Sequence, residues 1–276
     1  MEMTEGYAKT TSGDRRGKAR GRLALLKAAL NNLRHHAAGR CNICGKITVF
    51  VCADVVTSRN NMYCLFCRSL SRSRHVAKVI LQEVAQGVSA MCEIPEAKKF
   101  AIYNTDTLDA FSKALGKSRS YYSSGFFPGM KPGTQMRARV SCQDLEELTF
   151  EDGMFDLVIT EDVLEHVRHH ERAFQEIFRV LKVGGHHVFT VPCFFDRPTV
   201  VRVDTSGEED IHLLPPEFHG DSIRGKILAY RTFGIDVFDL LRRIGFETAV
   251  DFSRHLDQRW GIFDSYVFIS KKVACR

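Results

Sequence analysis

The chain has 276 residues, 44% of them hydrophobic, and a formal net charge of +6 at pH 7. This length supports one large domain or a domain with an appendage, and the 20 Phe residues can supply a sizeable core. No apolar run approaches the ~18–20 residues needed to cross a bilayer. The polar first residues lack the apolar centre of a signal peptide, so the sequence predicts a cytoplasmic protein.

Positive charge gathers near the N-terminus. Eight Lys or Arg residues lie between Arg15 and Arg40, with no acid among them. We predict a basic arm over residues 1–22 and an amphipathic helix over 23–39, which together form an N-terminal segment 1–39. Such an arm can contact nucleic acid or an anionic surface, or it can be a solvated leader, and the sequence leaves both open.

Two CxxC pairs follow, CNIC and CLFC, with nineteen residues between them. Each pair presents two thiolates to one ion, and two pairs complete a tetrahedral site with no open position. We therefore predict a zinc-ribbon-like module over 40–75 that holds a structural Zn²⁺. Its predicted ligands are Cys41, Cys44, Cys64 and Cys67. The module either braces the fold, forms a homodimer contact or, with the basic RSLSRSRH beside it, holds RNA.

The remaining chain, 76–276, alternates between helical and extended patterns. The predicted elements are helix 74–86, strand 100–103, helix 107–115, strands 120–124, 136–141 and 155–160, helix 171–182, strand 186–191, helix 236–244, and strands 246–251 and 265–270. This alternation predicts an α/β, Rossmann-like domain with a mostly parallel seven-stranded sheet and helices on both faces. The last two strands suit an antiparallel edge hairpin. The other cysteines are predicted to be packing residues: Cys52, Cys92, Cys142, Cys193 and Cys275.

The stretch from Phe155 to Pro192 reads FDLVITEDVLEHVRHHERAFQEIFRVLKVGGHHVFTVP. Its predicted first strand ends in three carboxylates and an imidazole, which is costly unless they are solvated or partnered. In open α/β sheets, ligands bind outside the carboxyl ends of the strands. We predict that Gly184 and Gly185 close the helix before the second strand.

This strand–VLEHV–helix–RVLKVGG–strand series resembles class I S-adenosylmethionine-dependent methyltransferases. The usual Gly-rich loop after the first strand is missing here, since Asn104-Thr105-Asp106-Thr107 follows FAIY. The chain is either a pseudoenzyme or a variant with a differently built loop, in which Asp106 caps the next helix. IYNTDTLDAFSKAL and LLPPEFHGD resemble a bacterial subgroup, similar to methyltransferase type 11, that lacks the Gly-rich loop, over residues 100 to 270.

The resemblance implies S-adenosyl-L-methionine as the cofactor and a set of residues around it. The implied contacts are Asn104, Thr105, Asp106, Ser124, Gly125, Asp144, Leu145, Thr160 and Glu161. The loop 104–106 matches the methionine end, 124–125 the ribose position without its usual acid, and Asp144 the adenine position. Thr160 and Glu161 match the border of the sulfonium, whose positive charge the carboxylates Glu161 and Asp162 would favour.

Methyl transfer needs alignment of the acceptor and, for a hydroxyl acceptor, a base within hydrogen-bond reach. The catalytic candidates are His166, His219 and Asp162. His219 lies in the predicted irregular segment 193–230, which either acts as a lid or is braced by its own polar residues. The leading prediction is an enzyme that methylates oxygen or nitrogen of a small molecule or glycan. The alternatives are an RNA methyltransferase that uses the ribbon and basic arm, and a non-catalytic scaffold.

Overall fold

The computed structural model describes residues 36–52, 61–97, 99–221 and 224–274. At its centre lies an eight-stranded sheet in the order β16-β17-β9-β8-β4-β5-β7-β6. Its strands are β4 (Ile102–Asn104), β5 (Tyr121–Gly125), β6 (Gln135–Arg137), β7 (Val140–Cys142), β8 (Phe155–Glu161), β9 (Leu181–Thr190), β16 (Phe246–Ser253) and β17 (Ser265–Lys272). The strands β7, β5, β4, β8 and β9 run parallel, which confirms the predicted Rossmann-like α/β fold.

One detail of the sheet differs from the prediction. The stretch predicted as one strand over 136–141 divides into β6 and β7, because Arg139 takes a left-handed φ of 59° and folds the chain back on itself. The sheet therefore has eight strands where the sequence predicted seven. The last two strands form the predicted antiparallel edge hairpin, in which β16 is the edge and β17 lies between β9 and β16.

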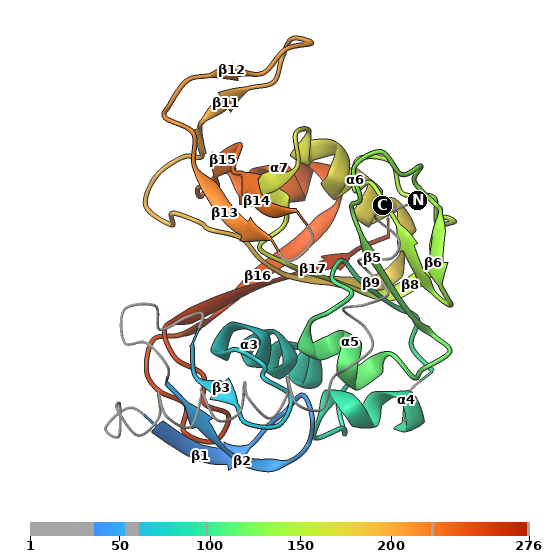
Figure 1. The fold of residues 1–276 in the computed structure, drawn as a ribbon, viewed down its shortest axis with the longest axis vertical. Helices are drawn as coiled ribbons and strands as arrows, with labels where there is room; N and C mark the ends of the chain where they lie inside the picture. The colour runs from blue at the N-terminus through green and yellow to red at the C-terminus, as the bar shows by residue number, and fades with distance from the viewer. Residues whose placement is uncertain (1–35, 53–60, 98, 222–223, 275–276) are drawn as a thin grey trace.

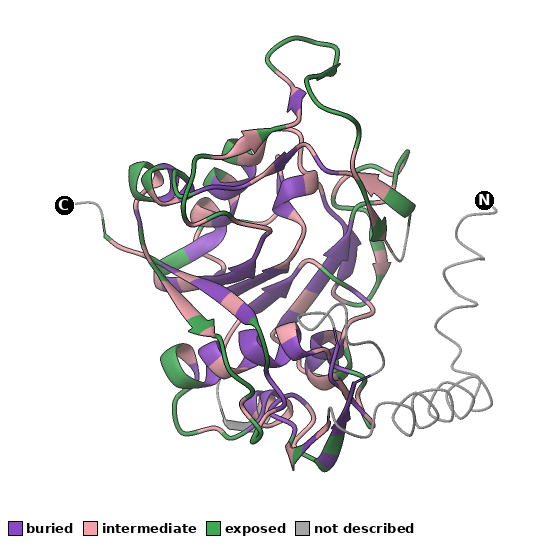
Figure 2. Cartoon of the chain, turned by 90° about the vertical axis from the view of Figure 1, so that its left-hand side faces the viewer, coloured by how far each residue is buried: buried purple, intermediate pink, exposed green. Residues whose placement is uncertain are grey.

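Helices cover both faces of the sheet (Figure 1). On one face lie α3 (Ser71–Val79), continued by a π-helical segment Ile80–Val84, then a 3₁₀ turn Met91–Glu93, α4 (Ile94–Ala97) and α5 (Ala110–Leu115). On the other lie α6 (His170–Val180) and α7 (Val237–Ile244). Leu157 and Ile159 of β8 belong to the core under α3 and α5, and Val158 to the core under α6 and α7. Side chains that alternate between two covered faces explain why Leu157, Val158 and Ile159 of β8 form an unbroken apolar run. Figure 2 shows these strands as the buried centre of the molecule.

The two glycines after α6 do not cap that helix as predicted. The helix ends at Val180 and the chain enters β9 at once. Gly184 has a φ of +81°, and the register of β8 against β9 shifts here, so residues 182–185 form an irregularity within the strand pair. A Cβ on Gly185 would lie 3.1 Å from the carbonyl oxygen of Phe155, so a side chain there would crowd the neighbouring strand.

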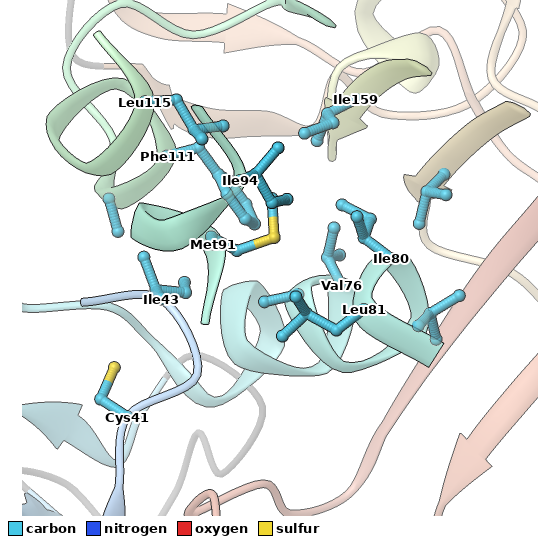
Figure 3. Close-up of a cluster of buried hydrophobic side chains, with 14 of the residues drawn as sticks. Cys41, Ile43, Val76, Ile80, Leu81, Met91, Ile94, Phe111, Leu115 and Ile159 are labelled. Carbon is cyan, nitrogen blue, oxygen red and sulfur yellow. The ribbon is translucent and has the colours of Figure 1, made fainter. Parts of the chain in front are cut away.

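The N-terminal strands form a small separate sheet of β1 (His36–Arg40), β2 (Ile47–Val51) and β3 (Tyr63–Cys64). The predicted basic arm and most of the predicted helix 23–39 lie outside the described residues. The helix prediction is wrong for 36–39, which pair with β2, and the backbone at Gly39 is so close to Arg259 that a Cβ would lie 2.0 Å from its carbonyl oxygen. Cys41 and Ile43 join one core with Ile80 and Met91 (Figure 3).

The segment predicted as irregular over 193–230 contains ordered strands. They are β10 (Val200–Val201), β11 (Val203–Asp204), β12 (Ile211–His212), β13 (Phe218–Asp221) and β14 (Gly225–Leu228), followed by β15 (Arg231–Thr232). The three antiparallel pairs are β10 with β15, β11 with β12, and β13 with β14. The β11–β12 pair projects away from the body of the protein (Figure 1).

Among the described residues, no helix has both the length and the apolar character required to cross a membrane. Eight of the nine cysteines are described, and no disulfide bond forms among these eight.

We expect Gly245→Ala to lower the free energy of unfolding by about 2–3 kcal/mol. Gly245 ends α7 with a φ of +114°, and a Cβ would lie 2.9 Å from the Phe178 ring. Gly153→Ala is the matched control, because Gly153 has a φ of +62° but open space around the added Cβ. That substitution should cost about 1 kcal/mol. Equal losses in urea unfolding of the two variants would contradict the predicted clash.

Candidate functional site

A cavity of about 1060 Å³ lies where four parallel strands end. The strand register sets this position, because Asn104 of β4 pairs with Ser123 of β5 and with Ile159 of β8, and Gly125 of β5 pairs with Cys142 of β7. The residues that follow β4, β5, β7 and β8 therefore meet along one edge of the sheet, where open α/β sheets bind ligands. The β13–β14 hairpin and the start of α3 complete the walls.

Most of the residues predicted for the site line this cavity. They are Thr105, Asp106, Ser124, Gly125, Asp144, Leu145, Glu161, Asp162, His166 and His219. Two predicted cofactor residues, Asn104 and Thr160, do not line it. The fold thus brings together segments that are more than one hundred residues apart in the chain.

Asn104 builds the loop that replaces the Gly-rich turn. Its side chain is buried, and its Nδ2 lies 3.0 Å from the Asp106 carbonyl, 3.0 Å from Asp109 Oδ2 and 2.9 Å from the Tyr121 hydroxyl. Asp109, and not Asp106 as predicted, caps α5, because its Oδ1 accepts the Ser112 amide at 2.7 Å. The loop is therefore held by side-chain hydrogen bonds in place of glycines.

Thr160 faces the core rather than the cavity, contrary to its predicted place beside the sulfonium. It is fully buried in β8, and its Oγ1 lies 3.0 Å from His187 Nε2. Successive side chains of a strand point to opposite faces, so Glu161 reaches the cavity wall and Thr160 does not.

The two carboxylates that follow β8 are partners of an arginine. Arg72 of α3 donates through Nη1 to Asp162, and its Nε lies 3.6 Å from Glu161 Oε1. Ser73 Oγ donates to Glu161 Oε2 at 3.0 Å, and Thr190 Oγ1 donates to Asp162 Oδ1 at 2.8 Å. The two acids that the sequence places beside the sulfonium thus also have a cationic partner within the fold, and one guanidinium offsets the charge of only one of them. Arg72 belongs to the RSLSRSRH segment, whose basic residues indicated RNA binding and not an ion pair within the fold.

Burial of the acidic side chains on this wall of the cavity favours their protonated forms. Burial raises the pKa of the Glu161 carboxyl above its ordinary range, while Arg72 lowers that pKa and Asp162 raises it. Burial, with Asp106 and Glu161 nearby, raises the pKa of the Asp109 carboxyl to about 8. The acids after β4 and β8 therefore act on one another across the edge of the sheet.

The pKa of Asp109 makes stability depend on pH. Its ordinary value is 3.8, so between about pH 4 and pH 8 the folded chain binds a proton that the unfolded chain does not. This group's contribution to the free energy of unfolding is full below about pH 4 and is lost as the pH rises to about 8. We expect Asp109→Asn to flatten this part of the stability profile, measured by urea unfolding at pH 5, 6.5 and 8. An unchanged profile would contradict the raised pKa.

The end of β5 carries no acid at the position where the resemblance implies ribose binding. Ser124 is buried, and its Oγ lies 2.7 Å from the Tyr103 hydroxyl. Gly125 and Phe126 follow it on the cavity wall. Beyond β7, Asp144 and Leu145, the residues predicted for the adenine position, also lie on the cavity wall.

Two histidines meet at the other end of the cavity. His166 lies in a 3₁₀ turn, Leu164–His166, directly after β8, and His219 lies in β13. His219 Nδ1 is 3.1 Å from His166 Nε2, and His166 Nδ1 donates to the Leu228 carbonyl at 2.8 Å. Burial lowers the pKa of His166 to about 4. Glu165 is fully buried beside both rings.

Arg231 holds the turn that carries these residues, and nothing in the sequence singled it out. It is buried in β15, and its guanidinium donates to the carbonyls of Leu164 at 3.3 Å, Val167 at 2.5 Å and Arg168 at 2.8 Å. Three backbone carbonyls bonded to one planar group leave the turn little freedom.

The four predicted zinc ligands lie together. Their Sγ atoms are all within 4.8 Å of one another, with Cys41 to Cys67 at 3.7 Å and Cys44 to Cys64 at 3.9 Å. Four sulfurs bound to zinc at about 2.3 Å have edges of about 3.8 Å, so the donor set fits a tetrahedral Zn²⁺. Arg74 lies behind the cluster, fully buried, and donates to the carbonyls of Trp260 at 2.6 Å and Gly261 at 2.8 Å.

The sheet order, with its antiparallel β17 inside the edge, and the cavity at the carboxyl ends define a class I methyltransferase fold. Residues 83–189 match the family model described as a methyltransferase domain. This part of the chain, less than half of its length, is therefore similar to methyltransferase domains.

One curated relative is the sarcosine/dimethylglycine N-methyltransferase of Halorhodospira halochloris, 30% identical over 131 residues, which are 44% of this chain and 43% of that protein. The chain thus spans less than half the length of the relative it matches. Among solved structures, an S-adenosylmethionine-dependent methyltransferase from Mesorhizobium loti is 17% identical with a TM-score of 0.38, covering 62% of this chain and 90% of its own. A methyltransferase in complex with the Trm112 activator from Haloferax volcanii is 15% identical with a TM-score of 0.45, covering 74% and 91%.

Proposed function

We propose that this protein transfers a methyl group from S-adenosyl-L-methionine to oxygen or nitrogen of a small-molecule or glycan acceptor. The observation that supports this proposal is the open cavity at the ends of β4, β5, β7 and β8, which is lined by seven of the nine residues that the resemblance assigns to the cofactor. Its volume of about 1060 Å³ lies just above the ~300–1,000 Å³ range of small-molecule sites. A scaffold without a ligand would have no need of such a space.

The cofactor end is the part of the cavity after β4, β5 and β7. Thr105 and Asp106 would hold the methionine part, and Asp144 and Leu145 the adenine. The Ser124 hydroxyl is already hydrogen-bonded to Tyr103, so it would contribute little to ribose binding. The contacts to the adenine and to the methionine part would therefore supply most of the binding free energy. When bound, S-adenosyl-L-methionine supplies an electrophilic methyl group, and the protein's part is to align the acceptor with it.

The acceptor end is the part between β8 and the β13–β14 hairpin. His166 and His219 face each other there, and we propose that they contact the acceptor. Asp162, also predicted as catalytic, is bonded to Arg72 and Thr190, so its proposed role is to position Arg72. The curated relative's name describes an N-methyltransferase, which is compatible with a nitrogen acceptor and does not select it.

We also propose that Cys41, Cys44, Cys64 and Cys67 hold a structural Zn²⁺. The tetrahedral separation of their sulfurs supports this, and the four protein ligands leave no coordination position for chemistry.

Titration calorimetry with S-adenosyl-L-methionine tests the function. We expect micromolar binding, and we expect Asp144→Ala to weaken it by about tenfold, the effect of ~1.4 kcal/mol for one lost polar contact. Glu147→Ala is the matched control, because Glu147 is exposed in the same turn and lies off the cavity wall. No heat and no thermal shift at millimolar ligand would overturn the proposal.

A further inference from the structure

Three donor atoms converge at the acceptor end of the cavity. His166 Nε2 and His219 Nδ1 are 3.1 Å apart, and Glu165 Oε1 lies 3.6 Å from the first and 3.8 Å from the second. Glu165 belongs to the cavity lining together with both histidines, and 0% of its surface is accessible. The three side chains come from the turn after β8 and from β13, so the β13–β14 hairpin brings the cluster together.

The outer nitrogen of each ring has a partner that determines its protonation. His166 Nδ1 lies 2.8 Å from the Leu228 carbonyl, which can only accept, so this nitrogen carries a hydrogen. His219 Nε2 lies 3.1 Å from Glu217 Oε1, and a carboxylate likewise requires a hydrogen on the ring nitrogen. In neutral rings, His166 Nε2 and His219 Nδ1 therefore point lone pairs at each other, beside a carboxylate. The two lone pairs and the carboxylate repel one another unless a positive charge lies between the three atoms.

The triangle has the dimensions of a metal coordination face. A circle through three points separated by 3.1, 3.6 and 3.8 Å has a radius of about 2.0 Å. This equals the ~2.0–2.2 Å bonds that imidazole nitrogen and carboxylate oxygen form with Zn²⁺. The outer partners also match, since metal-binding histidines donate their other N–H to a carbonyl or carboxylate, here Leu228 and Glu217. Glu217 is itself oriented by Arg202, 2.7 Å from its other oxygen.

We propose that Glu165, His166 and His219 bind one divalent transition-metal cation, of the class that includes Zn²⁺, Co²⁺ and Fe²⁺. Two imidazoles and one carboxylate suit these ions, and the open side of the face points into the cavity. The acceptor that completes the coordination carries an oxygen or nitrogen donor beside the atom to be methylated. The cation lowers the pKa of a bound hydroxyl, so the acceptor is deprotonated at neutral pH and its proton passes to solvent. Only this statement about the acceptor rests on the proposed function.

The test counts metal ions in the full chain. Wild-type protein is stripped, reloaded with Zn²⁺, passed over a desalting column and analysed by mass spectrometry. We expect two equivalents in the wild type and one in Glu165→Gln and His219→Ala. The matched control, His212→Ala, alters an exposed histidine of β12 and should retain two. Glu217→Gln should weaken the second equivalent by about 10–100-fold.

Co²⁺ identifies which site is filled, and circular dichroism establishes that each variant is folded. The thiolate site gives intense near-ultraviolet charge-transfer bands, whereas the proposed site contributes only weak visible bands, lost in His219→Ala. One equivalent in the wild type, unchanged by the cluster variants, would overturn the proposal in favour of a proton shared by the two rings. Calorimetry with S-adenosyl-L-methionine on the same samples separates the two proposals. A protein that binds the second metal equivalent but not the cofactor refutes the proposed function alone. A protein that binds the cofactor but not the second metal equivalent refutes the metal site alone.

Discussion

Cys64→Ser is expected to abolish binding of S-adenosyl-L-methionine, although no cysteine of the cluster lines the cofactor cavity. The reason is that the cluster is close in the chain to Arg72, which lies five residues after Cys67 at the start of α3. Ser69 Oγ lies 3.2 Å from Cys67 Sγ and 3.1 Å from Arg74 Nη1, so the cluster also orients the buried Arg74. Structural zinc contributes ~10–16 kcal/mol to the folding of small zinc modules, and its loss should release this end of α3.

Calorimetry and thermal unfolding measure this effect, with a chelator as an independent way to remove the ion. Cys193→Ser is the control, because its half-buried thiol lies outside the cluster and should leave both readouts nearly unchanged. Retained cofactor affinity in a zinc-free, folded Cys64→Ser protein would show that the module does not support the site.

Arg72→Met is expected to destabilise the fold by about 3–5 kcal/mol, the usual cost of breaking a buried ion pair. The substitution leaves Glu161 and Asp162 without their guanidinium partner, and both carboxylates are largely shielded from solvent. Affinity for S-adenosyl-L-methionine should also fall by at least tenfold, because the wall between the cofactor and acceptor ends loses its shape.

A double-mutant cycle with Asp162→Asn isolates the charge effect. The double variant should recover at least 1 kcal/mol relative to the sum of the single losses, since it removes one of the two uncompensated charges. Strict additivity in urea unfolding would mean that Arg72 acts through packing alone. Arg172→Met is the matched control, because Arg172 lies at an exposed position of α6 and should change stability by less than about 0.5 kcal/mol.

Local patterns in the sequence were sufficient for the order of the main elements and for much of the cavity wall. The apolar run Leu157-Val158-Ile159 predicts a strand covered on both faces, and the structure places those side chains alternately in two cores. The two CxxC pairs brought four sulfurs to tetrahedral separations. These predictions succeed because periodicity and spacing are properties of neighbouring residues, which the chain cannot rearrange when it folds.

Contacts between distant segments had no such local signal. Nothing near Arg72 in the chain indicates that it meets Glu161 and Asp162, about ninety residues later. Whether the Thr160 side chain points into the core or into the cavity depends on which residue of β8 is the last to face the core. A shift of one residue turns each side chain of the strand to the opposite face.

The composition and spacing of this sequence alone determined a Rossmann-like sheet, a four-cysteine cluster and a polar rim at the strand ends. Only the tertiary structure decided which rim groups neutralise one another and which converge on a common point. Glu165 and His166 are adjacent in the chain, but their meeting with His219 depends on how the β13–β14 hairpin packs against the turn after β8. Charge neutralisation and metal coordination depend on distances of a few ångströms between side chains. Those distances are set by the packing of helices and strands that lie far apart in the sequence.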